Sequence, residues 1–275
     1  MENYLKYDFV AKKFEEALPL GNGTLGAMVY GNPECEKISL NHDTLWSGKP
    51  REYTNPTAVS AFKRAQQMVL NGEYEKATSL LEEEFTCGWG NSYLPLGNIY
   101  IKNLGLKESL NYSRELDLSK ATATVKYSDG ENGYVCEYFV SHPDKCVVVR
   151  YRSEYSTDYE IGITSQVKNE ICSDGENLIL KGECPSVLAP DYARDFAPTV
   201  YDGKGIKFTG AIKVKSDGEV TVLNDKFIVK NATCFILIFT AETSFIKYNV
   251  APDKDSYTTC LNNLRLASDK SYEEL

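Results

Sequence analysis

The feature that most constrains this chain is a long series of short segments in which apolar and polar residues alternate. Alternation with a period of two is typical of β-strands, because successive side chains point to opposite faces of a sheet. Segments of this kind are residues 98–103, 121–127, 146–152, 159–167, 206–215, 219–223 and 226–240. About a dozen strands in one run predict a mainly β fold, a large antiparallel β-sandwich of two sheets around one core.

The turns between these segments carry a repeated sequence. Ser-Asp-Gly-Glu occurs at residues 128–131, 173–176 and 216–219. Asp-Gly favours tight hairpins because glycine adopts a positive φ at little cost. We therefore expect each copy to join two antiparallel strands. Regularly spaced turns also raise a β-propeller as an alternative, but nothing else in the sequence repeats at that period.

Other signals complete the expected architecture. Residues 26–41 read as a strand hairpin around Gly31-Asn32-Pro33. Residues 56–86 carry apolar side chains at helical spacing on both sides of Gly72, which predicts an inserted helical hairpin. Residues 256–275 return to helical spacing and reach the last residue without a stop signal. We interpret residues 1–255 as the sandwich domain and 256–275 as the start of a helical linker, and we expect a longer parent protein.

Charge and hydrophobicity exclude several classes of partner. The net charge is -9, and no run of Lys and Arg offers the cationic contacts on which nucleic-acid binding depends. The longest apolar run, residues 234–240, is far shorter than the roughly 20 residues of a membrane helix. Residues 1–13 do not resemble a signal peptide. We expect a soluble protein without nucleic-acid or membrane partners, either cytoplasmic or secreted with its signal absent from this sequence.

Motifs for cofactors and metals are weak. Residues 21–26 satisfy G-x-G-x-x-G, but a proline precedes them and a β-like segment follows, so we expect a glycine-rich turn rather than a nucleotide site. The chain has two histidines, His42 and His142, with no cysteine or carboxylate at ligand spacing. Eight cysteines include no C-x-x-C pair, which indicates mostly reduced thiols. No metal and no cofactor are therefore expected.

Several ordered motifs in the first half carry a family resemblance. They are residues 17–31 (ALPLGNGTLGAMVYG), 38–48 (ISLNHDTLWSG), 93–98 (YLPLGN), 112–118 (YSRELDL) and 137–144 (EYFVSHPD). In this order they resemble the N-terminal domain of glycoside hydrolase family 95, the α-L-fucosidases. The family pattern usually has Glu in place of His42 and an acid in place of Asn98. The second half resembles the family only in its strand pattern and in residues 271–275.

The resemblance implies an architecture and a role. In that family a β-sandwich precedes a helical linker and an (α/α)₆ barrel, and the barrel holds the catalytic residues. It implies a parent enzyme that cleaves α-L-fucosyl, or α-galactosyl, linkages by inversion and without a metal. We expect no catalytic residue in this chain. The expected partners are the barrel of the same parent chain and a fucosylated or galactosylated glycan.

One loop is the leading candidate for contact with sugar or with the barrel. It combines an aromatic ring with amide, carboxylate and hydroxyl groups, a set that suits stacking and hydrogen bonding to a sugar. Trp89, in residues 86–91, is a second and weaker candidate. The alternative is that Trp46 serves as a core or interface anchor. The candidate residues of the first loop are Asn41, His42, Asp43, Thr44 and Trp46.

Three functions remain open from the sequence. The first is an accessory domain that braces the barrel and shapes its cleft, inactive alone because a sandwich lacks a pocket for two opposed catalytic groups. The second is an autonomous carbohydrate-binding module that depends on Trp46. The third is a domain that serves oligomer contacts.

Overall fold

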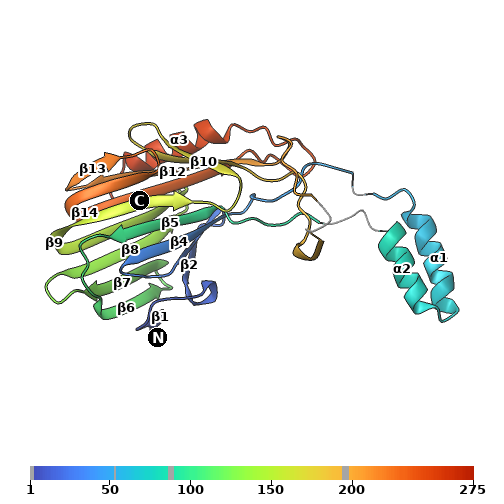
Figure 1. Ribbon diagram of the computed structural model, residues 1–275, viewed down its shortest axis with the longest axis horizontal. Helices are drawn as coiled ribbons and strands as arrows, with labels where there is room; N and C mark the ends of the chain where they lie inside the picture. The colour runs from blue at the N-terminus through green and yellow to red at the C-terminus, as the bar shows by residue number, and fades with distance from the viewer. Residues whose placement is uncertain (1–2, 53, 86–89, 194–197) are drawn as a thin grey trace.

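The computed structural model describes residues 3–52, 54–85, 90–193 and 198–275. Within these ranges, 14 strands join one antiparallel sheet that doubles back into two layers (Figure 1). Two long strands, β9 and β14, belong to both layers and lie side by side at the fold. Their bounds are Cys146–Thr164 for β9 and Lys226–Thr243 for β14.

Each layer is completed by strands that pair with one half of β9 or β14. One layer has the order β1-β6-β7-β8-β9-β14-β12-β11-β10, and the other has the order β2-β3-β4-β5-β9-β14-β13. The strands of the first layer are β1 Tyr4–Tyr7, β6 Leu110–Asp117, β7 Thr122–Ser128, β8 Gly133–Ser141, β10 Asn169–Ser173, β11 Leu178–Glu183 and β12 Lys207–Ser216. Those of the second are β2 Leu18–Gly21, β3 Leu25–Val29, β4 Cys35–His42, β5 Gly97–Asn103 and β13 Glu219–Val222.

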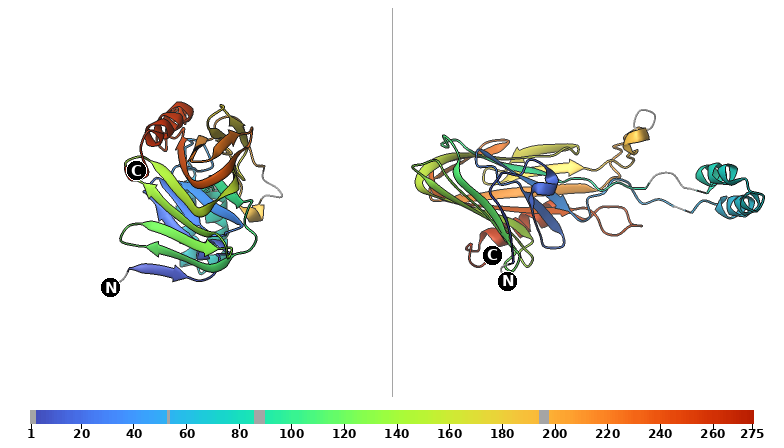
Figure 2. Two further views of the ribbon diagram at one scale, coloured as in Figure 1. Left: turned by 90° about the vertical axis from the view of Figure 1, so that its left-hand side faces the viewer. Right: turned by 90° about the horizontal axis from the view of Figure 1, so that it is seen from below.

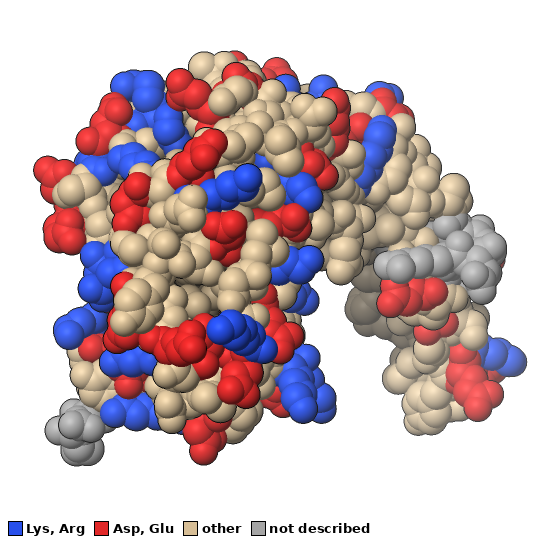
Figure 3. All heavy atoms as spheres, turned by 60° about the vertical axis from the view of Figure 1, so that its left-hand side comes forward, with Lys and Arg blue, Asp and Glu red and all other residues tan. Residues whose placement is uncertain are grey.

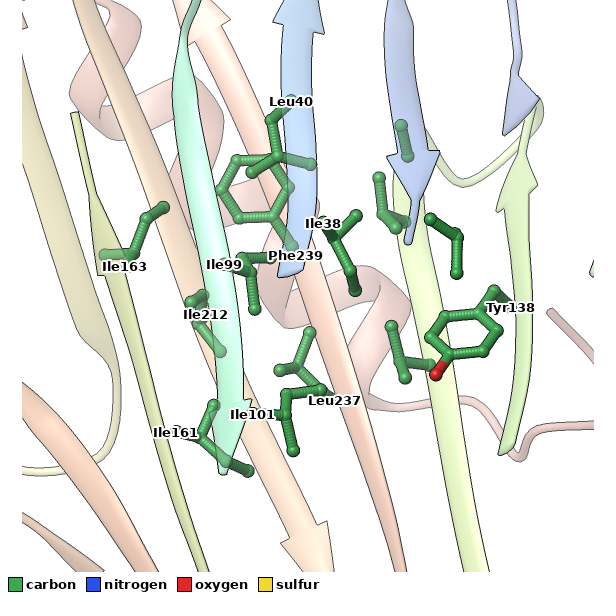
Figure 4. Close-up of a cluster of buried hydrophobic side chains, with 14 of the residues drawn as sticks. Ile38, Leu40, Ile99, Ile101, Tyr138, Ile161, Ile163, Ile212, Leu237 and Phe239 are labelled. Carbon is green, nitrogen blue, oxygen red and sulfur yellow. The ribbon is translucent and has the colours of Figure 1, made fainter. Parts of the chain in front are cut away.

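The core lies between the two layers. Strand β4 shows why: its even-numbered side chains from Glu36 to His42 are buried, whereas Lys37 is exposed. Figure 4 shows Ile38 of β4 and Ile99 of β5 facing Leu237 and Phe239 of β14. These side chains belong to one continuous hydrophobic cluster. The predicted large antiparallel sandwich is confirmed.

Two predicted strands turn out to be one. Residues 146–152 and 159–167 were expected to be separate, but β9 runs unbroken from Cys146 to Thr164. The polar stretch between them is still paired, since Thr157 lies opposite Ala232. That stretch is where the strand passes from one layer to the other, so its polarity marks a bend of the sheet rather than a turn.

Two of the three Ser-Asp-Gly-Glu copies form hairpins, and the third does not. Gly130 and Gly175 have positive φ, and they join β7 to β8 and β10 to β11. The copy at 216–219 instead links β12 to β13, and both of these strands pair with successive parts of β14. The expectation of a third two-stranded hairpin is wrong. The reason is that β14 is long enough to pair with both strands, so the chain continues along it.

The glycine-rich motif is a strand hairpin, as expected. Residues 21–26 connect β2 to β3, with Gly23 at a positive φ. Pro19 is accommodated because β2 pairs on one side only, with β3. The chain also turns between β3 and β4, so the hairpin predicted at 26–41 is confirmed. Short 3₁₀-helices occupy Phe14–Glu16 and Asp191–Ala193.

The predicted helical hairpin is present and projects from one end of the sandwich. Helix α1 spans Ala58–Leu70 and α2 spans Tyr74–Glu84, with Gly72 at a positive φ between them. Figures 1 and 2 show both helices well beyond the strands. The side chains of Asn55 and Thr57 both donate to the carbonyl of Glu84, at 2.8 and 2.9 Å, so the two ends of the hairpin lie together.

Helix α3, Ser256–Ser268, packs on the outer face of β12 and β14 (Figure 2). Its side chains Cys260, Leu264 and Ala267 form a second hydrophobic cluster with Val148 and Ile238. The expectation of a helix that continues to residue 275 is wrong. Tyr272 instead lies against the guanidinium of Arg150, whose carbon is 3.5 Å from the ring centroid, and this contact needs a turn after Ser268.

On the face that Figure 3 draws, acidic and basic side chains are interspersed without a continuous basic area. None of the described helices has the length and hydrophobicity that a membrane crossing requires. Cys87 lies outside the described residues, and the other seven cysteines are free thiols.

Candidate functional site

The candidate loop begins where β4 ends, at the end of the sandwich from which the helical hairpin projects. Leu45 is fully buried and anchors the loop, and its amide donates to the carbonyl of His42 at 3.1 Å. A second loop runs alongside, because the amide of Leu94 donates to the carbonyl of Leu45 at 3.0 Å. Burial of Leu45 turns its neighbour Trp46 outward.

Trp46 and Tyr93 form an exposed aromatic pair. Each is 41% exposed, and their ring centroids are 5.1 Å apart with the planes tilted by 57°. The indole N–H of Trp46 donates to the carbonyl of Asp43 at 2.9 Å, which fixes the ring. A rigid ring with one open face is the type of surface on which a sugar stacks.

A cleft of about 280 Å³ lies beside this pair. Segments far apart in the sequence converge on it: the candidate loop, Asn91, Ile206 and the stretch that follows β14. Apolar rings and chains form most of the wall, and the polar groups sit among them. The lining residues are Asp43, Thr44, Trp46, Ser47, Gly48, Lys49, Pro50, Asn91, Ile206, Phe245, Lys247, Tyr248, Val250 and Pro252.

His42 supports the loop from inside the sandwich. Its Nδ1 is 3.3 Å from the amide of Thr44, 3.0 Å from Thr44 Oγ1 and 3.1 Å from a carboxylate oxygen of Asp43. Thr44 Oγ1 is in turn 2.5 Å from Thr243 Oγ1 of β14, which ties the loop to the other layer. Burial lowers the pKa of His42, although the carboxylates of Asp43 and Glu242 oppose this. A neutral ring that accepts from the Thr44 amide at Nδ1 is therefore favoured.

The structure divides the predicted residues into two groups. Asp43, Thr44 and Trp46 line the cleft. Asn41 and His42 lie behind it, in the last two positions of β4. Trp89 falls outside the described residues. Because Trp46 is exposed, its alternative role as a core anchor is wrong, and its roles in an interface or in sugar contact remain open.

Sequence reasoning missed part of the wall. Phe245 and Tyr248 of the wall and Tyr93, the ring partner of Trp46, were not identified as site residues, and Tyr248 is 83% exposed. Tyr93 stands at the start of the YLPLGN motif, which was a usable signal. Phe245 and Tyr248 follow the longest apolar run of the sequence, where no pattern indicated that the chain returns to the candidate loop.

No cluster of three or more His, Cys, Asp or Glu side chains that could hold a metal occurs within the described ranges. In the cleft itself the polar groups are hydroxyls, amides, two lysines and the carboxylate of Asp43. Such groups can donate and accept hydrogen bonds from a polyol, and they suit recognition.

Comparisons with known proteins identify the family and the fold of this chain. Residues 5–248 match the family described as "Glycosyl hydrolase family 65, N-terminal domain". The chain is 28% identical over 290 aligned residues to "Alpha-L-fucosidase 2" of Arabidopsis thaliana, which covers 96% of this chain and 33% of that protein. It is 35% identical to "Probable alpha-fucosidase A" of Aspergillus oryzae over 50% of this chain and 20% of that protein.

A solved structure shares the fold. The "Putative kojibiose phosphorylase from human microbiome" superposes with a TM-score of 0.52 at 10% identity, over 100% of this chain and 36% of that chain. The chain thus spans about a third or less of these proteins. The chain belongs to the family of glycosyl hydrolase family 65 N-terminal domains, and its resemblance to the N-terminal domain of a fucosidase-like glycoside hydrolase is confirmed.

Proposed function

We propose that this chain is the non-catalytic N-terminal domain of an inverting, family 95 α-L-fucosidase-like enzyme, in which it braces the catalytic barrel and shapes the substrate cleft. The observation that carries the proposal is the hollowed, aromatic end of the sandwich around Trp46 and Tyr93. Monomeric proteins rarely leave large apolar patches exposed unless these meet a partner or a ligand. The similarity to fucosidases supports a glycan as that ligand.

The polar groups of the cleft support a non-catalytic role. Inverting hydrolysis needs an acid and a base on opposite faces of the sugar, about 6.5–9.5 Å apart in the usual carboxylate pair. Asp43 is the one carboxylate among the described residues that line this cleft. It is exposed on the rim, next to a histidine whose Nδ1 already has close partners.

The projecting hairpin supports a bracing role. Val59, Phe62, Leu70 and Tyr74 on its helices are exposed. Two helices that pack only against each other leave these apolar side chains in contact with water. Their burial against a larger domain would stabilise the hairpin. The hairpin leaves the same end of the sandwich as the aromatic cleft, and a catalytic barrel seated there would contact both.

The proposal is tested by hydrolysis of an aryl α-L-fucoside. We compare the 275-residue chain with the same chain extended through the coding sequence that follows it. Activity confined to the longer protein is expected. Activity of the 275-residue chain alone would overturn the non-catalytic role, and inactivity of both on aryl α-L-fucosides and α-galactosides would overturn the substrate class.

An autonomous carbohydrate-binding module is the second candidate, and the open face of the Trp46–Tyr93 pair favours it. It requires measurable affinity of the 275-residue chain for a fucosylated oligosaccharide. Trp46→Ala should abolish that affinity, whereas Tyr155→Ala, a matched loss of an exposed ring elsewhere on the sandwich, should not. A concentration-dependent dimer without sugar affinity would instead indicate an oligomerisation domain.

A further inference from the structure

A second and larger cleft, of about 750 Å³, adjoins the candidate site. Lys49, Pro50 and Pro252 line both clefts, so the two form one groove across the end of the sandwich. The larger part has a buried polar floor, in which Thr209 Oγ1 lies 3.2 Å from Ser256 Oγ. The groove therefore passes from an aromatic end to a hydroxyl-lined end.

The hydroxyl-lined end is rich in lysine. Two of its lysines are neutralised by carboxylates: Lys49 lies 2.9 Å from Asp202, and Lys254 lies 2.6 Å from Glu242. A third is placed over the ring of Tyr257, at 4.3 Å from its centroid. The five lysines that line this part are Lys49, Lys181, Lys204, Lys207 and Lys254.

The remaining two lysines, Lys204 and Lys207, are exposed and make no ion pair with any described residue. Two carboxylates share the cleft with them. Asp255 is committed to helix α3, because it accepts the amide of Thr258 at 3.0 Å. Asp253 is the other. Lys181, Lys204 and Lys207 have no carboxylate partner among the described residues, so three unpaired ammonium groups stand against these two carboxylates. This local excess stands out in a chain whose net charge is -9.

We propose that the groove binds an acidic oligosaccharide, with a neutral ring stacked at Trp46 and a sulfate ester or uronate carboxylate held by Lys204 and Lys207. This rests on the proposed contact between the aromatic cleft and a glycan, and it adds the charge of that glycan. Ammonium groups attract such anions at close range, and buried hydroxyls donate hydrogen bonds to their oxygens. The aromatic end adds a stacking contact for a sugar ring, which a free anion such as sulfate cannot make.

The test is calorimetric titration of the 275-residue chain at low and at physiological ionic strength. The probes are a neutral fucosylated oligosaccharide and the same oligosaccharide with one sulfate ester. We expect the sulfated form to bind about fivefold more tightly at low salt, since each partly exposed ion pair contributes a factor of a few, and to lose this advantage as salt screens the lysines. Equal affinities for the two probes would overturn the proposal.

Variants test whether Lys204 and Lys207 cause the preference for the sulfated probe. The double variant Lys204→Gln, Lys207→Gln should lose the preference for the sulfated probe and keep its affinity for the neutral one. The matched control is Lys102→Gln, Lys126→Gln, which removes two exposed lysines of β5 and β7 and should keep the preference. A preference that survives in the first double variant would overturn the assignment.

Two further probes separate glycan from other anions. Inorganic sulfate should bind far more weakly than the sulfated oligosaccharide, and Trp46→Ala should weaken both oligosaccharides. Sulfate binding as tight as that of the oligosaccharide, or tighter binding of a short single-stranded oligonucleotide, would overturn the proposal. Hydrolysis of a neutral aryl fucoside by the longer protein does not depend on these lysines, so the proposed function and this inference can fail separately.

Discussion

Glu36 is a carboxyl group enclosed in the core between the two layers. It is 1% exposed, and it accepts hydrogen bonds from the Tyr138 hydroxyl at 2.7 Å and from the amides of Gly31 and Lys37 at 2.8 and 2.9 Å. Burial raises its pKa from 4.5 to about 7, and these hydrogen bonds oppose the rise. Three donors that point at one carboxyl group keep the folded state intact when it ionises.

This predicts a pH dependence of stability. The pKa of Glu36 is higher in the folded chain than in the unfolded chain, so protonation of Glu36 stabilises the folded state. This contribution to the unfolding free energy is complete below pH 4.5 and is lost as the pH rises through 7. The loss amounts to about 3 kcal/mol of unfolding free energy. Glu36→Gln should remove this dependence. Urea unfolding at pH 5 and pH 8 measures it, with the exposed Glu131→Gln as control; parallel pH profiles for wild type and Glu36→Gln would contradict the prediction.

His42 sets the position of the loop that carries Trp46. Its replacement by Ala removes the acceptor for the Thr44 amide, and we expect the loop to loosen and the Trp46 ring to become more exposed to water. In a Trp89→Phe background, where Trp46 is the remaining tryptophan, the fluorescence maximum should shift to the red. His142→Ala, the other histidine and an exposed one, should leave the spectrum unchanged. An unshifted spectrum in His42→Ala would show that Leu45 alone holds the loop.

At this scale the sequence identified three of the fourteen residues that line the candidate cleft. The motif at residues 38–48 pointed to Asp43, Thr44 and Trp46, because ring and polar groups lie together in the chain. Phe245 and Tyr248 come from a segment some 200 residues further on. Their arrival beside Trp46 depends on the pairing of β14 with β9 and β12, which no local pattern encodes.

Among the elements, strands were predicted well wherever a turn residue separated them. The two Asp-Gly hairpins formed because Gly130 and Gly175 take positive φ. The element that could not be predicted is the single long β9, since the polar stretch after Arg152 looks the same whether it is a loop or the bend of a sheet. Pairing with a distant partner decides between the two, and it is a tertiary property.

The third Ser-Asp-Gly-Glu copy, at residues 216–219, stabilises an irregularity in β14 instead of forming a hairpin. Asp217 accepts the amides of Thr233 and Cys234, at 3.0 and 2.9 Å, at the place where the register of β14 against β9 shifts. It therefore holds the irregularity at which β14 passes between layers. Irregularities of this type bend a strand and strengthen its local twist.

Asp217→Ala should destabilise the fold by about 1 kcal/mol, because two strand amides lose a charged acceptor. Urea unfolding monitored by circular dichroism measures the effect. Asp225→Ala, in the neighbouring turn between β13 and β14, removes an exposed carboxylate and should change stability by less than about 0.5 kcal/mol. Equal stability of the two variants would mean that the shift in β14 is held by its pairing alone.

The whole molecule combines a cooperative sandwich with an appendage. Alternation predicted two layers with a shared core, and this is what β9 and β14 build. It could not predict that the layers are one continuous sheet, because two separate sheets with the same exposed and buried faces would give the same pattern. Likewise, helical spacing identified α1, α2 and α3 but not their different environments: α3 covers the sheet, whereas the hairpin stands clear of it.

That difference predicts unequal effects on stability. Excision of residues 56–84, with Asn55 and Phe85 joined through a short glycine linker, should leave the unfolding free energy of the sandwich within about 0.5 kcal/mol, since the ion pairs Arg64–Glu84 and Lys76–Glu73 are internal to the hairpin. Leu264→Ala in α3 should instead cost about 2–5 kcal/mol, because this side chain is buried against β12 and β14. In the longer protein, the excision should lower the proposed fucosidase activity, whereas Leu264→Ala should lower the stability of the sandwich. Loss of sandwich stability on excision would show that the hairpin belongs to the core fold and would remove the support it gives to a bracing role.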